Sequence, residues 1–155
     1  MNLWLRNVFF VLLQPGIVVG LIPYFIVTRS QAKSLATLHT THYLGLLAML
    51  VGLIVVLSCV FGFIKHGKGT LSPADPTQRL VIKGLYRYSR NPMYVGVLLL
   101  LLGEALLFGS AMLLLYMLLV GIGFHLFVVY VEEPRLRKDF GEQYKVYCQK
   151  VRRWV

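Results

Sequence analysis

Charged residues are scarce in this chain of 155 residues: they make up 14%, against 57% hydrophobic residues. Average soluble domains carry roughly a quarter charged residues, and a soluble domain of this size could not bury so much apolar surface. Acidic residues are the scarcest, with 6 Asp and Glu against 16 Lys and Arg. The composition therefore excludes an ordinary soluble domain and places most of the chain in lipid.

Several site types lack their usual residues. The chain has only two cysteines, Cys59 and Cys148, without metal-type spacing. The neighbouring His39 and His42 have no Cys, Asp or Glu nearby in the sequence that would complete a zinc site. We therefore predict no metal. A Gly-rich dinucleotide fingerprint is missing, which disfavours nicotinamide binding. No basic motif interleaved with aromatic residues is present, so we expect no nucleic-acid partner.

Long apolar runs dominate the chain instead. They cover residues 8–27, 43–64, 93–108 and 111–131. A membrane-spanning helix needs about 20 apolar residues, and Gly109-Ser110 would join the last two runs in a tight hairpin. The sequence predicts an all-α integral membrane protein, a single membrane domain over residues 1–155, with about four transmembrane helices.

The basic residues lie on one side of these runs. All but two of the 16 Lys and Arg residues fall before the first run, in the loop 65–91 or in the tail 132–155. Because cytoplasmic segments are enriched in Lys and Arg, we expect both termini and this loop in the cytoplasm. The net charge of +10, gathered on that face, predicts contact with anionic membrane lipids.

The third run begins with a strong helix-start signal. Asn91 is a good N-cap residue, and Pro92 suits the first helical position. The free N–H groups of a helix start attract anions, so an anion site is one interpretation. An ordinary helix start flanked by interfacial tyrosines (Tyr86, Tyr88 and Tyr94) is the alternative.

Two adjacent carboxylates follow the fourth run. We expect Pro134 to end the helix, which would leave Glu132 and Glu133 near the negative end of its dipole. Their repulsion calls for positive charge, supplied either by nearby arginines or by a bound cation. Because the hairpin puts Glu132 and the Asn91-Pro92 corner on one membrane side, a ligand carrying both charges would fit between them.

The tail is amphipathic, with large hydrophobic residues recurring at spacings of three and four, which is one helical face. These residues are Phe140, Tyr144, Tyr147, Val151 and Trp154. Such a helix lies in the membrane interface, either as a passive anchor or folded back over a neighbouring site.

The segment Arg90-Asn91-Pro92-Met93-Tyr94-Val95-Gly96 resembles the R-[HN]-P-x-Y-x-G motif of the isoprenylcysteine carboxyl methyltransferase family, which is related to membrane phospholipid methyltransferases. Upstream, Leu80-Val81 and Gly84-Leu85-Tyr86 resemble the family's lead-in. Downstream, Glu132-Glu133, Phe140-Gly141-Glu142-Gln143-Tyr144 and Val151-Arg152-Arg153-Trp154 resemble its last segments. The resemblance covers about residues 69–155.

The resemblance implies an S-adenosylmethionine-dependent methyltransferase whose multi-pass fold presents the cofactor pocket to the cytoplasm and takes a lipophilic acceptor from the bilayer. The cofactor-contact residues that it implies are Gln78, Arg79, Leu80, Val81, Tyr86, Arg90, Asn91, Pro92, Met93, Tyr94, Glu132 and Glu133. The segments 65–91 and 132–155 would thus form the cofactor site. Glu132 would meet the positive groups of the cofactor, and Arg90 or the helix start would meet its carboxylate.

The acceptor side departs from the family pattern. Where isoprenylcysteine enzymes have an arginine four residues before the motif glutamate, this chain has Val128. The acceptor therefore stays open between an isoprenylcysteine-like carboxylate, a phospholipid and another small hydrophobic molecule. An amine or hydroxyl acceptor must lose a proton.

Two side chains are candidates for that catalytic base. His125 precedes Glu132 by seven residues, about 10 Å along one expected helical face. Glu104 lies within an apolar run, where ionisable groups are functional by default, although it could instead hydrogen-bond Tyr116 across the hairpin.

Two other functions fit the sequence. A non-catalytic membrane protein could bind lipid or a partner through the basic face, and a membrane reductase of similar architecture would bind a nicotinamide. The sequence does not decide the oligomeric state.

Overall fold

The computed structural model describes residues 16–29, 39–66, 80 and 82–155, and most of these residues are helical. The elements are η1 (Gly16–Leu21), α2 (Ile22–Arg29), α3 (Thr40–His66), η2 (Gly84–Arg87), α4 (Pro92–Phe108), α5 (Ala111–Phe127), η3 (Val128–Glu132) and α6 (Glu133–Lys150). Within those ranges, β-type pairing is limited to one isolated parallel bridge between Ser89 and Arg152. The all-α prediction is confirmed.

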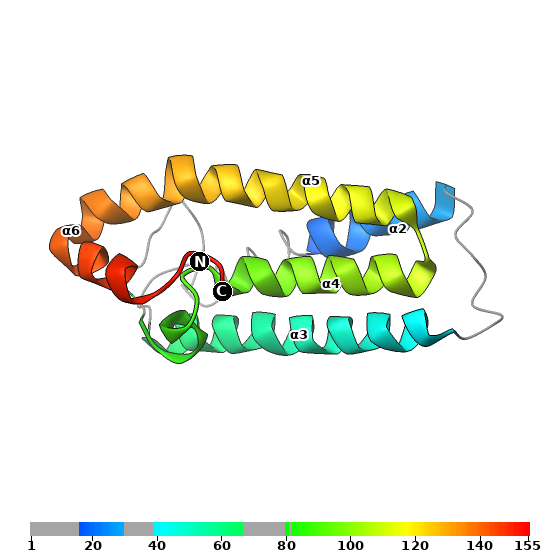
Figure 1. Ribbon diagram of the computed structural model, residues 1–155, viewed down its shortest axis with the longest axis horizontal. Helices are drawn as coiled ribbons and strands as arrows, with labels where there is room; N and C mark the ends of the chain where they lie inside the picture. Colours follow the sequence, from blue (N-terminus) through cyan, green and yellow to red (C-terminus); the bar gives the residue numbers. More distant parts are fainter. Residues whose placement is uncertain (1–15, 30–38, 67–79, 81) are drawn as a thin grey trace, which may run out of the picture.

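Three long helices lie side by side, with α4 between α3 and α5 (Figure 1). The short helix α2 packs against α4 and α5 near the α4–α5 turn. Helix α6 and the C-terminus lie at the other end, together with η2 and the start of α4 (Figure 1). The candidate site residues are therefore gathered at one end of the bundle.

Glycines let α3 and α4 approach closely. A Cβ atom on Gly52 would lie 2.8 Å from the carbonyl oxygen of Gly96, and one on Gly45 would lie 2.8 Å from that of Gly103. The two helices are antiparallel, so each glycine pair, spaced seven residues apart along its helix, faces the other pair. Small residues at such crossings allow backbone-to-backbone packing in membrane helix pairs.

The α4–α5 hairpin is as tight as the sequence predicts. Gly109 takes the left-handed conformation, with φ at 56°, which glycine adopts without a steric cost. The Ser110 hydroxyl then caps α5 by accepting a hydrogen bond from the backbone N–H of Leu113, at 3.3 Å. The hairpin returns the end of α5 to the level of the first turn of α4.

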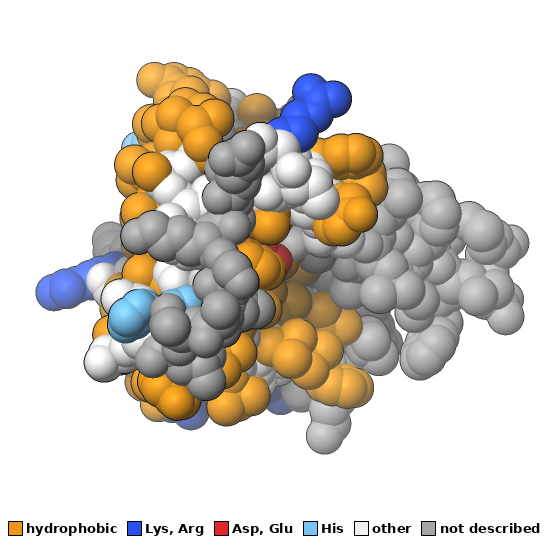
Figure 2. All heavy atoms as spheres, turned by 90° about the vertical axis from the view of Figure 1, so that its right-hand side faces the viewer, with side chains coloured by type: hydrophobic (Ala, Val, Ile, Leu, Met, Phe, Trp, Pro, Cys, Tyr) orange, Lys and Arg blue, Asp and Glu red, His pale blue; other side chains and the backbone are white. Residues whose placement is uncertain are grey.

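Two helices, Thr40–Gly62 and Ala111–Lys150, are long and apolar enough to cross a membrane, with mean hydropathies of 2.9 and 2.4. The apolar helices Gly16–Arg29 and Pro92–Phe108 are shorter. Large hydrophobic side chains on α3 and α5 point outward, and the end seen in Figure 2 is mainly hydrophobic where it is described. An apolar exterior of this kind fits association with a membrane.

The prediction that Pro134 ends the fourth helix is wrong. The helix passes from α5 through the π-helical turn η3 into α6, with Pro134 as the second residue of α6. Proline lacks an N–H and its ring clashes with the carbonyl four residues earlier, and a wider π turn relieves that clash. Pro23 likewise follows the π turn η1 as the second residue of α2.

The chain reverses direction later, at Gly141, whose φ of 49° and ψ of −119° interrupt α6. The segment after this kink runs back toward the start of α4 (Figure 1). Because the helix continues past Pro134, Glu132 and Glu133 lie within it and not at a free helix end. Glu132 contacts Tyr94 in the first turn of α4, and Glu133 contacts Arg90 in the loop before α4.

Candidate functional site

Helix α4 starts at Pro92 as predicted, but Asn91 does not cap it with its side chain. The Asn91 amide nitrogen Nδ2 instead donates to the carbonyl oxygen of Arg153, at 3.0 Å. Its backbone N–H donates to the hydroxyl of Ser89, at 3.1 Å. Asn91 thus holds the predicted N-cap position, but its side chain makes no capping hydrogen bond because it binds the C-terminal residues instead.

Residues 151–155, here called the C-terminal strap, lie across the loop before α4. The backbone N–H of Arg90 donates to the carbonyl of Arg152, at 2.9 Å. The second half of α6 packs beneath the strap through one buried face formed by Tyr144, Tyr147 and Val151. Tyr144, Tyr147 and Val151 share a face as predicted, with Phe140 packed against it, and the tail folds back over a neighbouring site. Trp154 does not belong to that helical face, because α6 ends at Lys150 and the indole contacts His125.

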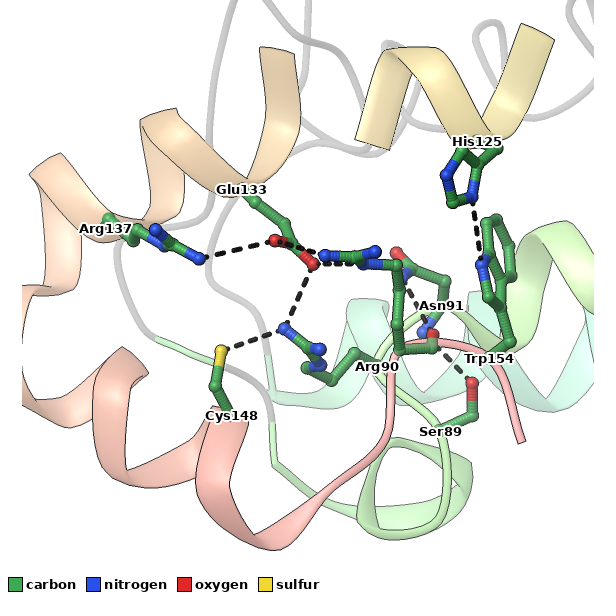
Figure 3. A network of polar contacts seen from close by, with 9 residues as sticks. Ser89, Arg90, Asn91, His125, Glu133, Arg137, Cys148 and Trp154 are labelled. Atoms are coloured by element: carbon green, nitrogen blue, oxygen red, sulfur yellow. Dashed lines mark hydrogen bonds and ion pairs between the residues drawn. The ribbon is translucent and has the colours of Figure 1, made fainter. Parts of the chain in front are cut away.

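Glu133 is the centre of an ion-pair network (Figure 3). Its carboxylate accepts from Arg90 Nη1 at 3.0 Å and from Arg153 Nε at 2.7 Å and Nη2 at 3.1 Å. Arg137 adds a third positive group at 3.6 Å. Burial alone would raise the pKa of Glu133, but the hydrogen bond from Arg153 and the surrounding charges outweigh it and hold this pKa below its usual value.

Glu132 has a different environment from its neighbour. Its Oε2 atom accepts a hydrogen bond from the Tyr94 hydroxyl, at 3.0 Å. Across residues 16–29, 39–66, 80 and 82–155, no Lys or Arg makes an ion pair with it. Burial raises the pKa of Glu132, more than the Tyr94 hydrogen bond lowers it. Arg135 attracts this carboxylate only from a distance, without an ion pair. A partly buried carboxylate without a directly paired cation is costly, so Glu132 is the acid that a bound cation would stabilise.

Arg90 belongs to the Glu133 network, but one of its N–H groups has no hydrogen-bond partner among the described residues. Its Nη1 atom contacts both Glu133 and the sulfur of Cys148, the latter at 2.9 Å. Its Nε atom is buried and has no hydrogen-bond partner in the described part of the chain. Buried polar groups are nearly always paired, so this N–H can donate a hydrogen bond to an oxygen atom of a ligand.

Tyr86 also belongs to this end of the bundle. Its backbone carbonyl accepts from the Tyr147 hydroxyl, at 2.6 Å. Burial, with smaller effects from Cys59 and Glu132, raises the pKa of Tyr86 well above its usual value. Tyr86, Tyr94 and Glu132 thus lie near one another, and their contact with a cofactor stays a prediction.

Among the other implied residues, Pro92 and Met93 open α4, and Leu80 packs against the buried face of the tail. Gln78, Arg79 and Val81 lie outside the described residues, as do residues 8–15 of the first apolar run and most of the loop 65–91.

The two predicted catalytic side chains lie apart from the Tyr94–Glu132 pair. Glu104 is ten residues beyond Tyr94 on α4, about 15 Å along the helix axis. Its Oε2 atom is buried without a partner in the described ranges. The Tyr116 hydroxyl donates to the carbonyl of Val18, at 3.0 Å, and not to Glu104.

His125 does not share the face of Glu132 as expected. The π turn η3 changes the angular spacing of side chains, and the residue that faces Tyr94 together with Glu132 is Phe124, with ring centroids 4.6 Å apart. The His125 side chain is exposed and contacts Trp154 instead.

Sequence reasoning missed several members of this site, namely Ser89, Phe124, Cys148 and Arg153. Of these, Arg153 had a signal, since the terminal Arg-Arg-Trp sequence belongs to the family resemblance. The other three residues contact residues that are far away in the sequence, and such contacts produce no local sequence pattern.

A sequence profile of the family described as phospholipid methyltransferase matches residues 40–143, which is more than half of the chain. Among curated proteins, an uncharacterized protein from Haemophilus influenzae is 36% identical over 63 residues. That alignment covers 41% of this chain and 100% of the relative. No solved structure matches the chain.

Proposed function

The chain belongs to the phospholipid methyltransferase family, and on that premise we propose that it is an integral membrane methyltransferase that transfers a methyl group from S-adenosylmethionine to a lipophilic acceptor. We propose four membrane spans with both termini in the cytoplasm, and an active site at the cytoplasmic end of α4 and η3. The basic residues in the loop 65–91 and the tail 132–155 support this orientation.

The contrast between Glu132 and Glu133 carries the proposal. Glu133 is neutralised by arginines of the protein, whereas the partly buried Glu132 has the Tyr94 hydroxyl as its hydrogen-bond partner and no ion pair among the described residues. S-adenosylmethionine has a sulfonium and an ammonium group, so a partly buried carboxylate without a directly paired cation fits its positive charge. The unpaired Nε–H of Arg90 fits its carboxylate.

Each residue of the site then has a role in binding. Glu132 balances the positive charge, and the Tyr94 hydroxyl fixes the orientation of that carboxylate. The Glu133 network holds Arg90 and the C-terminal strap in place. Tyr86 closes the site toward α3, where it lies beside Cys59.

When bound, the cofactor supplies an electrophilic methyl group, and the protein must align the acceptor with it in a site that excludes water. The site residues named above provide that alignment on the cofactor side. Glu104 and His125 stay predictions for a base, since neither contacts the Tyr94–Glu132 pair.

The acceptor that we propose is a lipid. The family supports this choice, and Val128, which stands where isoprenylcysteine enzymes have an arginine, is buried with 1% exposure. A buried valine cannot hold an acceptor carboxylate, so an isoprenylcysteine substrate is the less favoured choice.

Transfer of a radioactive methyl group into extractable lipid tests the proposal. Membranes containing the protein should label lipid when given methyl-labelled S-adenosylmethionine, and Glu132→Gln should reduce labelling by about tenfold or more, as expected for loss of a charged contact. Glu142→Gln is the matched control, because Glu142 is an exposed acid on α6. No labelling by folded protein in any lipid mixture would contradict a methyltransferase and favour a lipid-binding protein. Nicotinamide binding would favour a reductase.

A further inference from the structure

The end of the chain fixes the tautomer of His125. The indole Nε1–H of Trp154 donates to His125 Nδ1, at 3.4 Å, and the two rings are stacked with centroids 6.1 Å apart (Figure 3). A neutral imidazole that accepts at Nδ1 carries its hydrogen on Nε2. His125 is therefore arranged as a hydrogen-bond donor through Nε2, a role that differs from the catalytic base considered above.

His125 is also an exposed polar side chain on α5 near the proposed cofactor site. Its side chain is exposed, and its neighbours Leu126 and Phe127 are exposed hydrophobic residues. Tyr116, the other titratable residue of α5, lies more than two turns away and is bonded to Val18. An N–H donor surrounded by apolar side chains suits a ligand with a polar head and hydrocarbon chains.

His125 lies close in the chain to residues of the proposed cofactor site. Its neighbour Phe124 packs on Tyr94, which holds Glu132. A lipid headgroup at His125 would thus lie next to a residue that packs on the Tyr94–Glu132 pair of the proposed cofactor site.

We propose that His125 Nε2–H, oriented by Trp154, binds a phosphate oxygen of a phospholipid acceptor at the membrane interface. This inference rests on the proposed function, since it names the acceptor class of the same site. In this chain the donor comes from His125, one turn before the buried Val128, where related enzymes have an arginine. His125 is then a specificity-determining residue, and Trp154 is its positioning residue.

Trp154 fluorescence provides a direct readout. The chain has two tryptophans, so Trp4→Phe leaves Trp154 as the reporter. In neutral detergent micelles, addition of phosphatidylglycerol should change its emission with a saturable midpoint. His125→Ala should raise that midpoint by about tenfold, as expected for loss of a hydrogen bond to a charged group. Tyr130→Phe is the control, since Tyr130 is exposed nearby on η3 and should leave the midpoint unchanged.

Further measurements distinguish phospholipid from free phosphate as the ligand, and the lipid-site inference from the methyltransferase proposal. Inorganic phosphate should produce no response in lipid-free micelles, and an equal response would overturn a lipid site. Binding of S-adenosylhomocysteine should persist in His125→Ala, which shows that this variant is folded. If that binding persists while the phosphatidylglycerol midpoint is unchanged, the inference fails and the methyltransferase proposal stands. If wild-type protein binds no S-adenosylhomocysteine yet shows a His125-dependent lipid midpoint, the methyltransferase proposal fails and the lipid site stands.

Nitrogen-15 NMR of labelled histidine tests the tautomer independently. The hydrogen of His125 should reside on Nε2 in the wild-type protein, and Trp154→Phe, which removes the indole donor but keeps an aromatic ring, should mix the two tautomers. A hydrogen on Nδ1 in the wild-type protein would contradict the assigned donor.

Discussion

Tyr94 and Glu132 are 38 residues apart in the chain, and the Tyr94 hydroxyl donates to the Glu132 carboxylate at 3.0 Å. The contact ties the first turn of α4 to the π turn at the end of α5. The carboxylate is partly buried, and its hydrogen-bond partner in this contact carries no charge. In this site the acidic Glu132 is therefore paired with the neutral Tyr94, whereas the adjacent Glu133 is paired with arginines.

Tyr94→Phe should weaken binding of S-adenosylhomocysteine by about fivefold to tenfold, because Glu132 loses the hydroxyl that orients it, an interaction worth about 1 kcal/mol. The fold should persist, since the phenyl ring still packs on Phe124. Titration calorimetry of the detergent-purified variant measures the change. Unaltered affinity would mean that the pair does not contribute to the cofactor site.

Cofactor binding should depend on pH through Glu132. Burial raises the pKa of this carboxyl above 4.5, its ordinary value, and only the ionised form attracts a cation. Affinity should therefore fall with decreasing pH at a midpoint higher than that of an ordinary glutamate. Tyr94→Phe should move the midpoint higher still, because the Tyr94 hydrogen bond lowers this pKa. A flat affinity profile would exclude Glu132 as the titrating group.

Glu133→Gln should destabilise the protein by about 3 kcal/mol, because it leaves buried Arg90 and partly buried Arg153 without their anion. The folded pKa of Glu133 lies below its usual value. Its contribution to stability is therefore present at neutral pH and is lost as the pH falls through the folded pKa. The variant should show a smaller loss of stability on acidification, measured by thermal unfolding in detergent. Asp139→Asn, at an exposed pair with Arg135, should have little effect.

Gly103→Ala should lower stability by about 2 kcal/mol, the usual cost of an added methyl group in a packed core. The new Cβ would collide with Met49 and would lie 2.6 Å from the Gly45 carbonyl oxygen of α3. Gly123→Ala on α5 is the matched control, because its Cβ would meet no atom within 4 Å and alanine favours helices. Equal thermal midpoints for the two variants would contradict the close α3–α4 crossing.

Apolar periodicity and turn residues were sufficient to predict much of the fold. The run 43–64 lies within α3, the run 93–108 nearly coincides with α4, and Gly109-Ser110 forms the expected hairpin. These features depend on local sequence. The motif around Asn91 and Tyr94 lies at the end of the bundle where the ion-pair network of Glu133 is found, and its role in cofactor binding stays a prediction.

The sequence was less informative where tertiary contacts override local rules. Pro134 does not end its helix, because a π turn relieves the clash that its ring would cause. That turn moves Phe124, and not His125, to the face of Glu132. The Asn91 side-chain amide donates to the C-terminal strap instead of capping α4. This contact depends on the reversal of the chain at Gly141, which is far away in the sequence. None of these contacts has a short-range signature.

The most direct test of the central claim is calorimetric titration of the purified protein with S-adenosylhomocysteine, comparing wild type, Glu132→Gln and Glu142→Gln. Saturable binding that is lost or weakened by about tenfold only in Glu132→Gln, as expected for loss of an interaction with a charged group, is the predicted result. Binding of equal strength in all three proteins, or no binding by the folded wild type with lipid present, would contradict the assignment of Glu132 as the cofactor-binding acid.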